Sequence, residues 1–196
     1  MIKNNINIPT PSNDELKKYL KKWDTMENYV LQENALNKLF FETYPNNNDM
    51  DDILIKASSL NDFYSTNIFS IFPVAKNIYE LKIDSRLKKG DLNLVNDISK
   101  VTISGKNKNF YSFASKYCSH HFPNKYPIYD SYLDEVLRYF RKKDEFFEFK
   151  NKDLKEYKKY HNILNSFKEF YKIDCSLKDL DRYLWQLGKE YFPKKY

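Results

Sequence analysis

Apolar side chains recur along most of this chain at intervals of three and four residues, which is the spacing of one face of an α-helix. No segment of real length alternates between apolar and polar residues with a period of two. The pattern therefore predicts about ten short helices with brief connections, in a compact all-α fold. The clearest helical faces are Leu16, Tyr19, Leu20 and Trp23 near the start of the chain and Leu177, Leu180, Leu184 and Leu187 near its end.

Capping residues mark where several of these helices begin and end. Ser12 is followed three residues later by Glu15, and Ser176 by Asp179, which is the spacing of a capping box at a helix N-terminus. Gly90 is placed to end a short helix, because glycine readily adopts the left-handed conformation found just after helices.

The remaining elements and the domain organisation follow from the same pattern. No repeat, low-complexity tract or linker divides the chain, so 1–196 is predicted to be a single all-helical domain with a flexible N-terminus at about 1–11. Other predicted elements are helices over 49–64, 68–81, 83–90 and 152–171, a polar loop over 102–109, and a short helix rather than a strand over 144–150.

Composition narrows the classes of function. The chain carries a net charge of +6 and a pI of about 9.0, which favours an anionic partner such as DNA or another nucleic acid. The alternative is that abundant lysine and asparagine reflect only an AT-rich genome. The chain has only 3 Gly, which argues against a glycine-rich phosphate loop or a dinucleotide-binding fingerprint.

Cysteine spacing and hydropathy set further limits. Cys118 and Cys175 have neither the spacing of a metal site nor the pattern of a disulfide scaffold, and no metal or cofactor is predicted. The longest apolar run, over 68–75, is too short to span a bilayer, and the N-terminus has no apolar signal core. We therefore expect a cytoplasmic protein without a membrane segment.

The segment over 110–139 concentrates the residues best suited to chemistry. A helix is predicted over 108–121, with an apolar face and a polar stripe that contains Ser112, Lys116 and His120. Lys116 is accordingly expected to lie off the core, beside His120.

A basic loop with Lys106, Lys108 and a glycine precedes this helix. The N-terminus of a helix that follows such a loop is a natural place for a phosphate, because free backbone N–H groups and the helix dipole point toward it.

A second helix is predicted to begin at Asp130 or Ser131, and either residue is suited to be its N-cap. Lys116 and Asp130 then lie on adjoining elements, where they could face one cleft. In such a cleft an amine attacks a sugar carbon, and a carboxylate stabilises the developing positive charge. The alternatives are a plain helix cap for Asp130 and a solvated surface lysine for Lys116.

Two resemblances to known families appear in this chain. The closer one is to a widespread bacterial family of uncharacterised proteins, which the chain resembles along most of its length. The stretches that carry it are NIFSIFPVAKNI, YSFASKYCSHH, YPIYDSY and LDRYLWQLGKEYF. This resemblance by itself implies no activity.

The second resemblance is to the helix-hairpin-helix DNA glycosylase superfamily. The stretch YSFASK, which ends at Lys116, is similar to the hairpin motif P-G-V-G-x-K, and YDSYL, which contains Asp130, is similar to V-D-T-H-V. The resemblance implies an all-helical fold, a Schiff-base lysine at Lys116 and a catalytic aspartate at Asp130. Ser112 and Ala114 stand where that hairpin has glycines, and no cysteine cluster for an iron–sulfur centre follows.

The sequence therefore favours a nucleic-acid-associated helical protein, in its sharpest form a DNA glycosylase-like enzyme that acts through Lys116 and Asp130. The alternatives are a module that binds nucleic acid without chemistry and a protein–protein interaction domain, for which the 17 Tyr are well suited. In the enzyme hypothesis the nucleic-acid-binding residues are Lys106, Lys108, Ser112 and His120, and the residues that stack on an extruded base are Tyr117, Tyr129 and Tyr132.

Overall fold

The computed structural model describes residues 7–194, and helices dominate this part of the chain. Besides its α-helices, the structure contains two short helices of other types, the π-helix η1 (Lys38–Thr43) and the 3-10 helix η2 (Asn151–Lys155). The predicted all-α fold is thus confirmed. The α-helices are α1 (Asn13–Asp24), α2 (Glu27–Asn37), α3 (Met50–Phe63), α4 (Ile71–Glu80), α5 (Asp84–Lys89), α6 (Asn93–Ser99), α7 (Tyr111–His121), α8 (Ser131–Asp144), α9 (Tyr157–Phe170) and α10 (Leu177–Tyr191).

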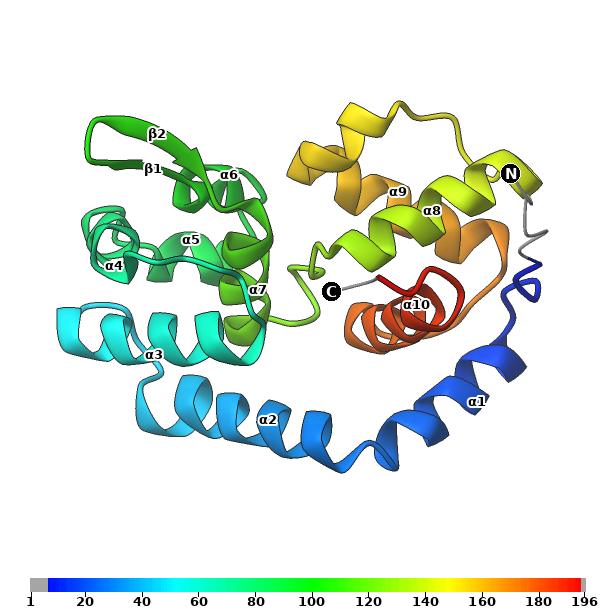
Figure 1. Cartoon of the computed structure of the whole chain (residues 1–196), viewed down its shortest axis with the longest axis horizontal. Helices are drawn as coiled ribbons and strands as arrows, with labels where there is room; N and C mark the ends of the chain where they lie inside the picture. The colour runs from blue at the N-terminus through cyan, green and yellow to red at the C-terminus, as the bar shows by residue number, and fades with distance from the viewer. Residues whose placement is uncertain (1–6, 195–196) are drawn as a thin grey trace.

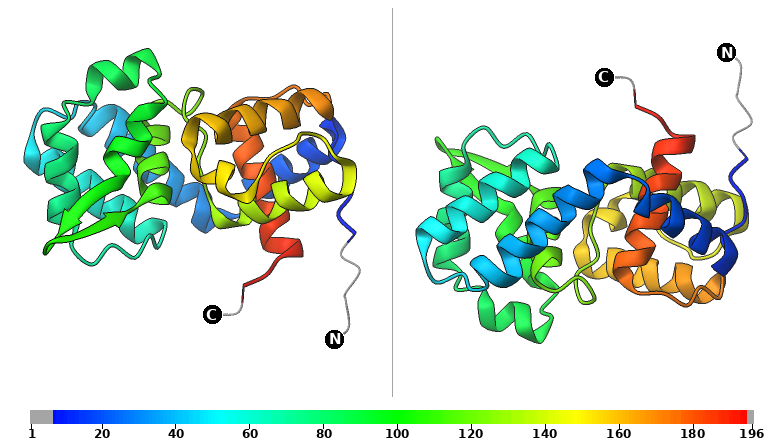
Figure 2. Two further views of the ribbon diagram at one scale, coloured as in Figure 1. Left: turned by 90° about the horizontal axis from the view of Figure 1, so that it is seen from above. Right: turned by 90° about the horizontal axis from the view of Figure 1, so that it is seen from below.

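The helices gather in two groups, which Figure 1 shows side by side. One group contains α3 to α7, and the other contains α8, α9 and α10. Helices α1 and α2 run along one edge of the molecule and join the groups, because α1 packs on α10 and α2 packs on α3. The chain returns to the second group through the link between α7 and α8, and both views in Figure 2 show this link between the groups.

The predicted caps are confirmed at both ends of the chain. The Ser12 hydroxyl accepts a hydrogen bond from the backbone N–H of Glu15 at 3.2 Å, and the Ser176 hydroxyl accepts one from Asp179 at 3.0 Å. Gly90 follows α5 with φ of 73°, the left-handed conformation that a side chain disfavours. Local sequence therefore determines these helix boundaries.

The polar loop expected over 102–109 is instead part of a β-hairpin. Strands β1 (Lys100–Ile103) and β2 (Lys106–Asn109) pair antiparallel, with Ile103 opposite Lys106. Ser104 and Gly105 between them both have positive φ, which is the conformation of a two-residue hairpin turn whose twist matches that of the strands. The Ser-Gly pair was the signal in the sequence for this turn.

Two predictions near the C-terminal half also need correction. The segment over 144–150 is irregular rather than helical, because Glu145 adopts a left-handed conformation that ends α8. The long helix expected over 152–171 is divided, since η2 precedes α9 and Glu156 between them is extended.

The N-terminal segment is ordered where the structure describes it. The predicted flexible stretch at about 1–11 includes 1–6, which lie outside the described residues. Ile8 is fully buried; its N–H donates to the Tyr139 hydroxyl at 3.1 Å, and its carbonyl accepts from Lys143 at 2.7 Å. Ile8 is therefore held against α8.

Helices α8 and α10 approach closely at Gly188. A Cβ atom at this position would lie 2.4 Å from the Cβ of Tyr132 and 2.9 Å from its carbonyl oxygen. Both distances are shorter than van der Waals contact, so only glycine fits without movement of one helix. This contact fixes how the start of α8 lies against α10.

We expect Gly188→Ala to lower the free energy of unfolding by about 1–3 kcal/mol, because the overlap with α8 forces the helices apart. Alanine favours an isolated helix over glycine by about 1 kcal/mol, which opposes this loss but does not cancel it. Urea unfolding measures the difference, with Asn34→Ala on the exposed face of α2 as the control. A Gly188→Ala protein as stable as the parent would show that the close approach is wrong.

Within residues 7–194, the helices lack the length and the apolar character needed to cross a bilayer.

Candidate active site

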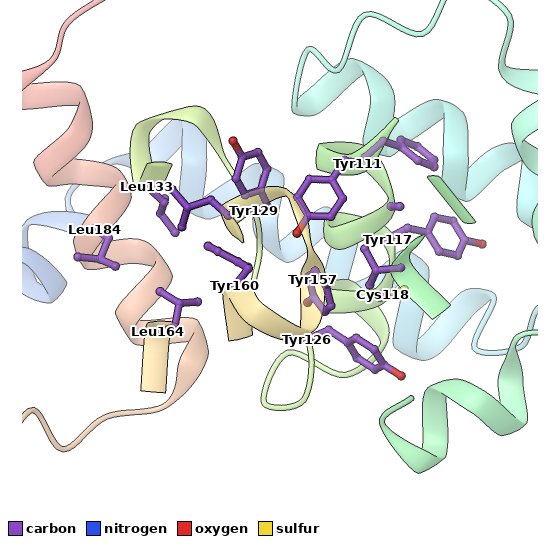
Figure 3. Close-up of a cluster of buried hydrophobic side chains, with 14 of the residues drawn as sticks. Tyr111, Tyr117, Cys118, Tyr126, Tyr129, Leu133, Tyr157, Tyr160, Leu164 and Leu184 are labelled. Atoms are coloured by element: carbon purple, nitrogen blue, oxygen red, sulfur yellow. The ribbon is translucent and has the colours of Figure 1, made fainter. Parts of the chain in front are cut away.

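The link between α7 and α8 is fixed by hydrogen bonds from both helix groups. Tyr157 and Tyr160 of α9 donate their hydroxyls to the carbonyls of Pro127 at 2.7 Å and Ile128 at 2.6 Å. Figure 3 shows Tyr160 next to Tyr129, and Tyr157 next to Tyr126. The carbonyls of Pro127 and Ile128 therefore each have a donor, as buried backbone requires.

Helix α7 holds the other side of this link. The hydroxyl of Ser115 accepts from the N–H of Tyr129 at 3.0 Å, and the hydroxyl of Ser112 donates to the carbonyl of Tyr129 at 3.1 Å. The link therefore folds back along α7, which places Asp130 next to a residue fourteen positions earlier in the chain.

That residue is Lys116, whose side chain is only 2% exposed. Its ammonium donates to the Ser112 hydroxyl at 2.6 Å and to the Tyr129 carbonyl at 3.2 Å, and lies 3.4 Å from Oδ2 of Asp130. The expectation that Lys116 lies off the core is thus wrong. A buried amine is costly without partners; here α7 supplies one, at Ser112, and the folded link supplies two, at Tyr129 and Asp130.

Asp130 uses its two carboxylate oxygens for different purposes. Oδ1 accepts the N–H of Tyr132 at 2.9 Å and caps α8, which selects Asp130 over Ser131 as the N-cap. Oδ2 faces Lys116. The side chain is 22% exposed, so the ion pair is buried at the lysine and open to solvent at the aspartate.

Tyr64 and His120 lie on the other side of the amine. The Nζ atom of Lys116 is 5.2 Å from the centroid of the Tyr64 ring, and the Tyr64 hydroxyl is hydrogen-bonded to Nε2 of His120 at 3.0 Å. Burial holds the pKa of His120 well below its usual value, and the positive charges of Lys178 and Lys116 lower it further. His120 is therefore neutral at pH 7.

Helix α10 brings a second carboxylate and two cations toward the same place. Glu33 of α2 is buried and pairs with Lys178 at 2.9 Å and with Arg182 at 3.0 Å. Asp181 lies between these two cations in the sequence. Burial raises the pKa of Asp181 to about 6; Lys178 and Lys116 lower it, while Asp130 and Glu33 raise it. Lys116, Asp130 and Asp181 therefore belong to one electrostatic cluster.

Comparison with known proteins places this chain in a family. A family model described as the HI_0787_N N-terminal domain matches residues 15–125, which is more than half of the chain. The chain belongs to the HI_0787_N family. The matched region contains Tyr64, Lys116 and His120, and it ends before Asp130 and Asp181.

One relative covers most of this HI_0787_N chain. A protein of Haemophilus influenzae named "Uncharacterized protein" is 53% identical over 146 residues, which are 74% of this chain and 70% of the relative. No solved structure matches the chain. The predicted membership of a bacterial family of uncharacterised proteins is confirmed.

The other predicted nucleic-acid-binding residues occupy two different places in this HI_0787_N protein. Lys106 and Lys108 are exposed on β2, in the hairpin that Figure 1 shows at the outer edge of the first group. Ser112 and His120 instead lie beside Lys116, where Ser112 donates to the Tyr129 carbonyl and His120 is buried. The hairpin residues thus do not contribute to the Lys116 cluster.

The three predicted base-stacking tyrosines are buried. Tyr117 is fully buried and donates its hydroxyl to Asn47 at 2.6 Å, and Tyr129 donates its hydroxyl to Asp134 at 2.6 Å. Tyr132 packs against Gly188 at the α8–α10 contact. In this structure these rings have no open face for a base, because all three serve the core, as Figure 3 shows for Tyr117 and Tyr129.

Two site residues had no usable signal in the sequence. Tyr64 fell on the predicted apolar face of its helix, and Asp181 is one of many charged residues on the last helix. Neither lies near Lys116 in sequence, so only the packing of α3 and α10 brings them to it. Within residues 7–194, no group of three or more His, Cys, Asp and Glu side chains is arranged to hold a metal ion.

Proposed function

We propose that this protein is a nucleic-acid-associated enzyme that cleaves an N-glycosidic bond through Lys116 and Asp130. The observation that supports it is the ion pair itself: an amine that is 2% exposed lies 3.4 Å from a carboxylate that is 22% exposed. The likeness of YSFASK and YDSYL to the helix-hairpin-helix DNA glycosylases supports the same residues independently.

In the proposed reaction, Asp130 takes a proton from the Lys116 ammonium, and the resulting amine attacks C1′ of a nucleotide. A bond from Nζ to C1′ forms as the bond from C1′ to the base breaks, and the base leaves with the electron pair and takes up a proton. Opening of the sugar ring then gives an iminium ion on Lys116, and water hydrolyses it.

The base must leave the stack before the amine can reach its sugar. Phe69 is suited to fill the space that an extruded base leaves, because it is a fully exposed aromatic residue five positions after Tyr64. Its loop is rigidly held: the side-chain oxygen of Asn61 accepts from Thr66 at 2.7 Å and from the N–H of Ile68 at 3.0 Å. The exposed ring therefore projects from a loop that these hydrogen bonds hold in place.

The alternative is that Lys116 and Asp130 form only a structural clamp between α7 and α8. Buried ion pairs contribute little net stability compared with apolar residues of similar size, so the pair alone does not decide between the two roles. Incubation with a panel of duplexes, each with one damaged or mismatched base, in the presence of borohydride separates them. Catalysis leaves a covalent protein–DNA adduct on at least one duplex, whereas a clamp leaves none on any.

Binding to a short duplex is expected to weaken steeply as salt increases. Each phosphate that a lysine or arginine neutralises releases counterions, so four phosphate contacts reduce affinity by roughly a hundredfold between 50 and 200 mM salt. Fluorescence anisotropy with labelled duplex, single-stranded DNA and RNA measures this slope. Affinity that does not change with salt, or no binding at low salt, contradicts association with nucleic acid.

A further inference from the structure

Asp181 lies on the face of α10 that packs against the start of α8. It lies seven residues before Gly188 on α10, which is two helical turns along the same face. Gly188 packs on Tyr132, two residues after Asp130. The face of α10 that contacts the start of α8 therefore also carries Asp181, whose charge interacts with those of Lys116 and Asp130.

No hydrogen bond or ion pair from residues 7–194 engages the Asp181 carboxylate, although it has cations on both sides in the sequence. Lys178 and Arg182 both bind Glu33 instead, at 2.9 and 3.0 Å. A partly buried carboxylate without a partner costs stability, since desolvation is not repaid by a contact. Such a cost is typical of functional sites, where groups are arranged for a ligand rather than for the fold.

We propose that Asp181 is the acid of the Lys116–Asp130 site, and that it donates a proton to the departing base. This inference rests on the proposed function and adds a substrate class to it. A neutral base is a poor leaving group unless a ring nitrogen is protonated, whereas an N-alkylated cationic base leaves without a proton. A site with an acid at this position is therefore suited to the release of neutral bases.

The proton of Asp181 moves to a ring nitrogen of the base, and the electron pair of the C1′–N bond goes to the base as that bond breaks. Nζ of Lys116 forms the new bond to C1′, and Asp130 holds the proton that the amine gave up. Asp181 is left as a carboxylate and takes a new proton from water.

The charged surroundings of Asp181 suit this role. Its pKa of about 6 is raised chiefly by burial, so a useful fraction is protonated near neutral pH while proton transfer stays favourable. The titratable groups that interact electrostatically with it are Lys178 on its own helix, Lys116 of α7, Asp130 at the start of α8, Glu33 of α2, Tyr64 after α3 and Tyr160 of α9.

The test compares the full-length protein with Asp181→Asn on duplexes that contain one neutral base, uracil or hypoxanthine, or one cationic base, 7-methylguanine. We expect Asp181→Asn to slow release of the neutral base by about a hundredfold or more and to change release of the cationic base by less than about threefold. For the parent, release of the neutral base should fall as pH rises above about 6, and Asp181→Asn should lose this dependence. Asp174→Asn, an exposed carboxylate before α10, is the matched control.

Stability provides a readout that does not depend on substrate. A carboxyl whose pKa is raised in the folded state contributes stability at pH 4 that is lost as pH rises through about 6. Asp181→Asn should therefore melt at a higher temperature than the parent at pH 7.5, and this difference should shrink toward pH 4. This result also shows that loss of activity does not come from misfolding.

The outcomes separate this inference from the proposed function. A parent protein that releases no base overturns both. If the parent releases base, but Asp181→Asn is unchanged or is slowed equally on the neutral and the cationic base, only the role of Asp181 is overturned. A parent that acts on the cationic base alone overturns the same role. Selective loss on the neutral base together with the higher melting temperature supports it.

Discussion

Replacing Lys116 with Met is expected to abolish borohydride trapping and to slow base release by about a thousandfold or more. Methionine keeps much of the length of the side chain but has no amine to attack C1′. The fold should tolerate the change, because the Tyr129 carbonyl keeps its hydrogen bond from Ser112 and Asp130 keeps its cap and its contact with water. Assays quenched at fixed times measure the rate of base release, and gel electrophoresis measures the trapped covalent adduct.

Asp130 allows charge and capping to be separated. Asp130→Asn keeps the α8 cap, since asparagine caps helices as well as aspartate does, but removes the negative charge next to Lys116. We expect it to be nearly as inactive as Lys116→Met, while Asp130→Ala loses about 1 kcal/mol more stability than Asp130→Asn. Lys158→Met and Asp24→Asn, at exposed positions, should keep parental activity. If Asp130→Asn is fully active, the carboxylate has no role beyond capping.

Replacing Lys56 with Met is expected to lower the free energy of unfolding by about 3–5 kcal/mol. Lys56 is fully buried, and its ammonium donates to the Tyr44 carbonyl at 3.0 Å, the Asn46 carbonyl at 2.7 Å and Oδ1 of Asn47 at 2.7 Å. Methionine leaves two backbone carbonyls without this donor in the core, which is the costly way to remove a buried group.

The measurement for Lys56 is urea unfolding, with Lys76→Met as the matched control. Lys76 forms an exposed ion pair with Glu80 at 3.7 Å, and such pairs contribute about 0–1 kcal/mol. Loss of less than about 1 kcal/mol at Lys56 would show that its hydrogen bonds do not hold the segment after η1 to α3.

The two buried lysines differ in what surrounds them. The acceptors of Lys56 are two backbone carbonyls and an asparagine, while Asp84 and Asp52 act on it only through their charge and oppose a fall in its pKa to about 8 that burial causes. Lys116 has a carboxylate partner that is open to solvent, a neutral histidine and a tyrosine ring nearby. Lys56 is therefore placed to stabilise the fold, whereas Lys116 has the surroundings that the proposed reaction needs.

The parts of the fold that could be predicted depend on residues close together in sequence. Ser12 and Ser176 cap helices through N–H groups three residues away, and Asp130 caps α8 through one two residues away. Gly90 ends α5 through its own backbone conformation. Such local rules also indicated that Lys116 and Asp130 lie on adjoining helices.

What could not be predicted depends on how distant segments pack. The polar stripe of α7 was expected to face solvent, but the 122–130 link covers it and buries Lys116 and His120. Tyr64 and Asp181 reach the site only through the packing of α3 on α7 and of α10 on α8. The periodicity of a helix shows which residues share a face, and it does not show what will cover that face.

The central claim is that Lys116 is a nucleophile, and mass spectrometry of the borohydride-reduced adduct tests it most directly. Parent protein is incubated with the duplex panel and borohydride, digested, and mapped for lysines that carry the sugar residue. We expect one modified peptide, with the mass increase on Lys116, and no adduct from Lys116→Met. An adduct on any other lysine, or no adduct from the parent on any duplex, would contradict the claim.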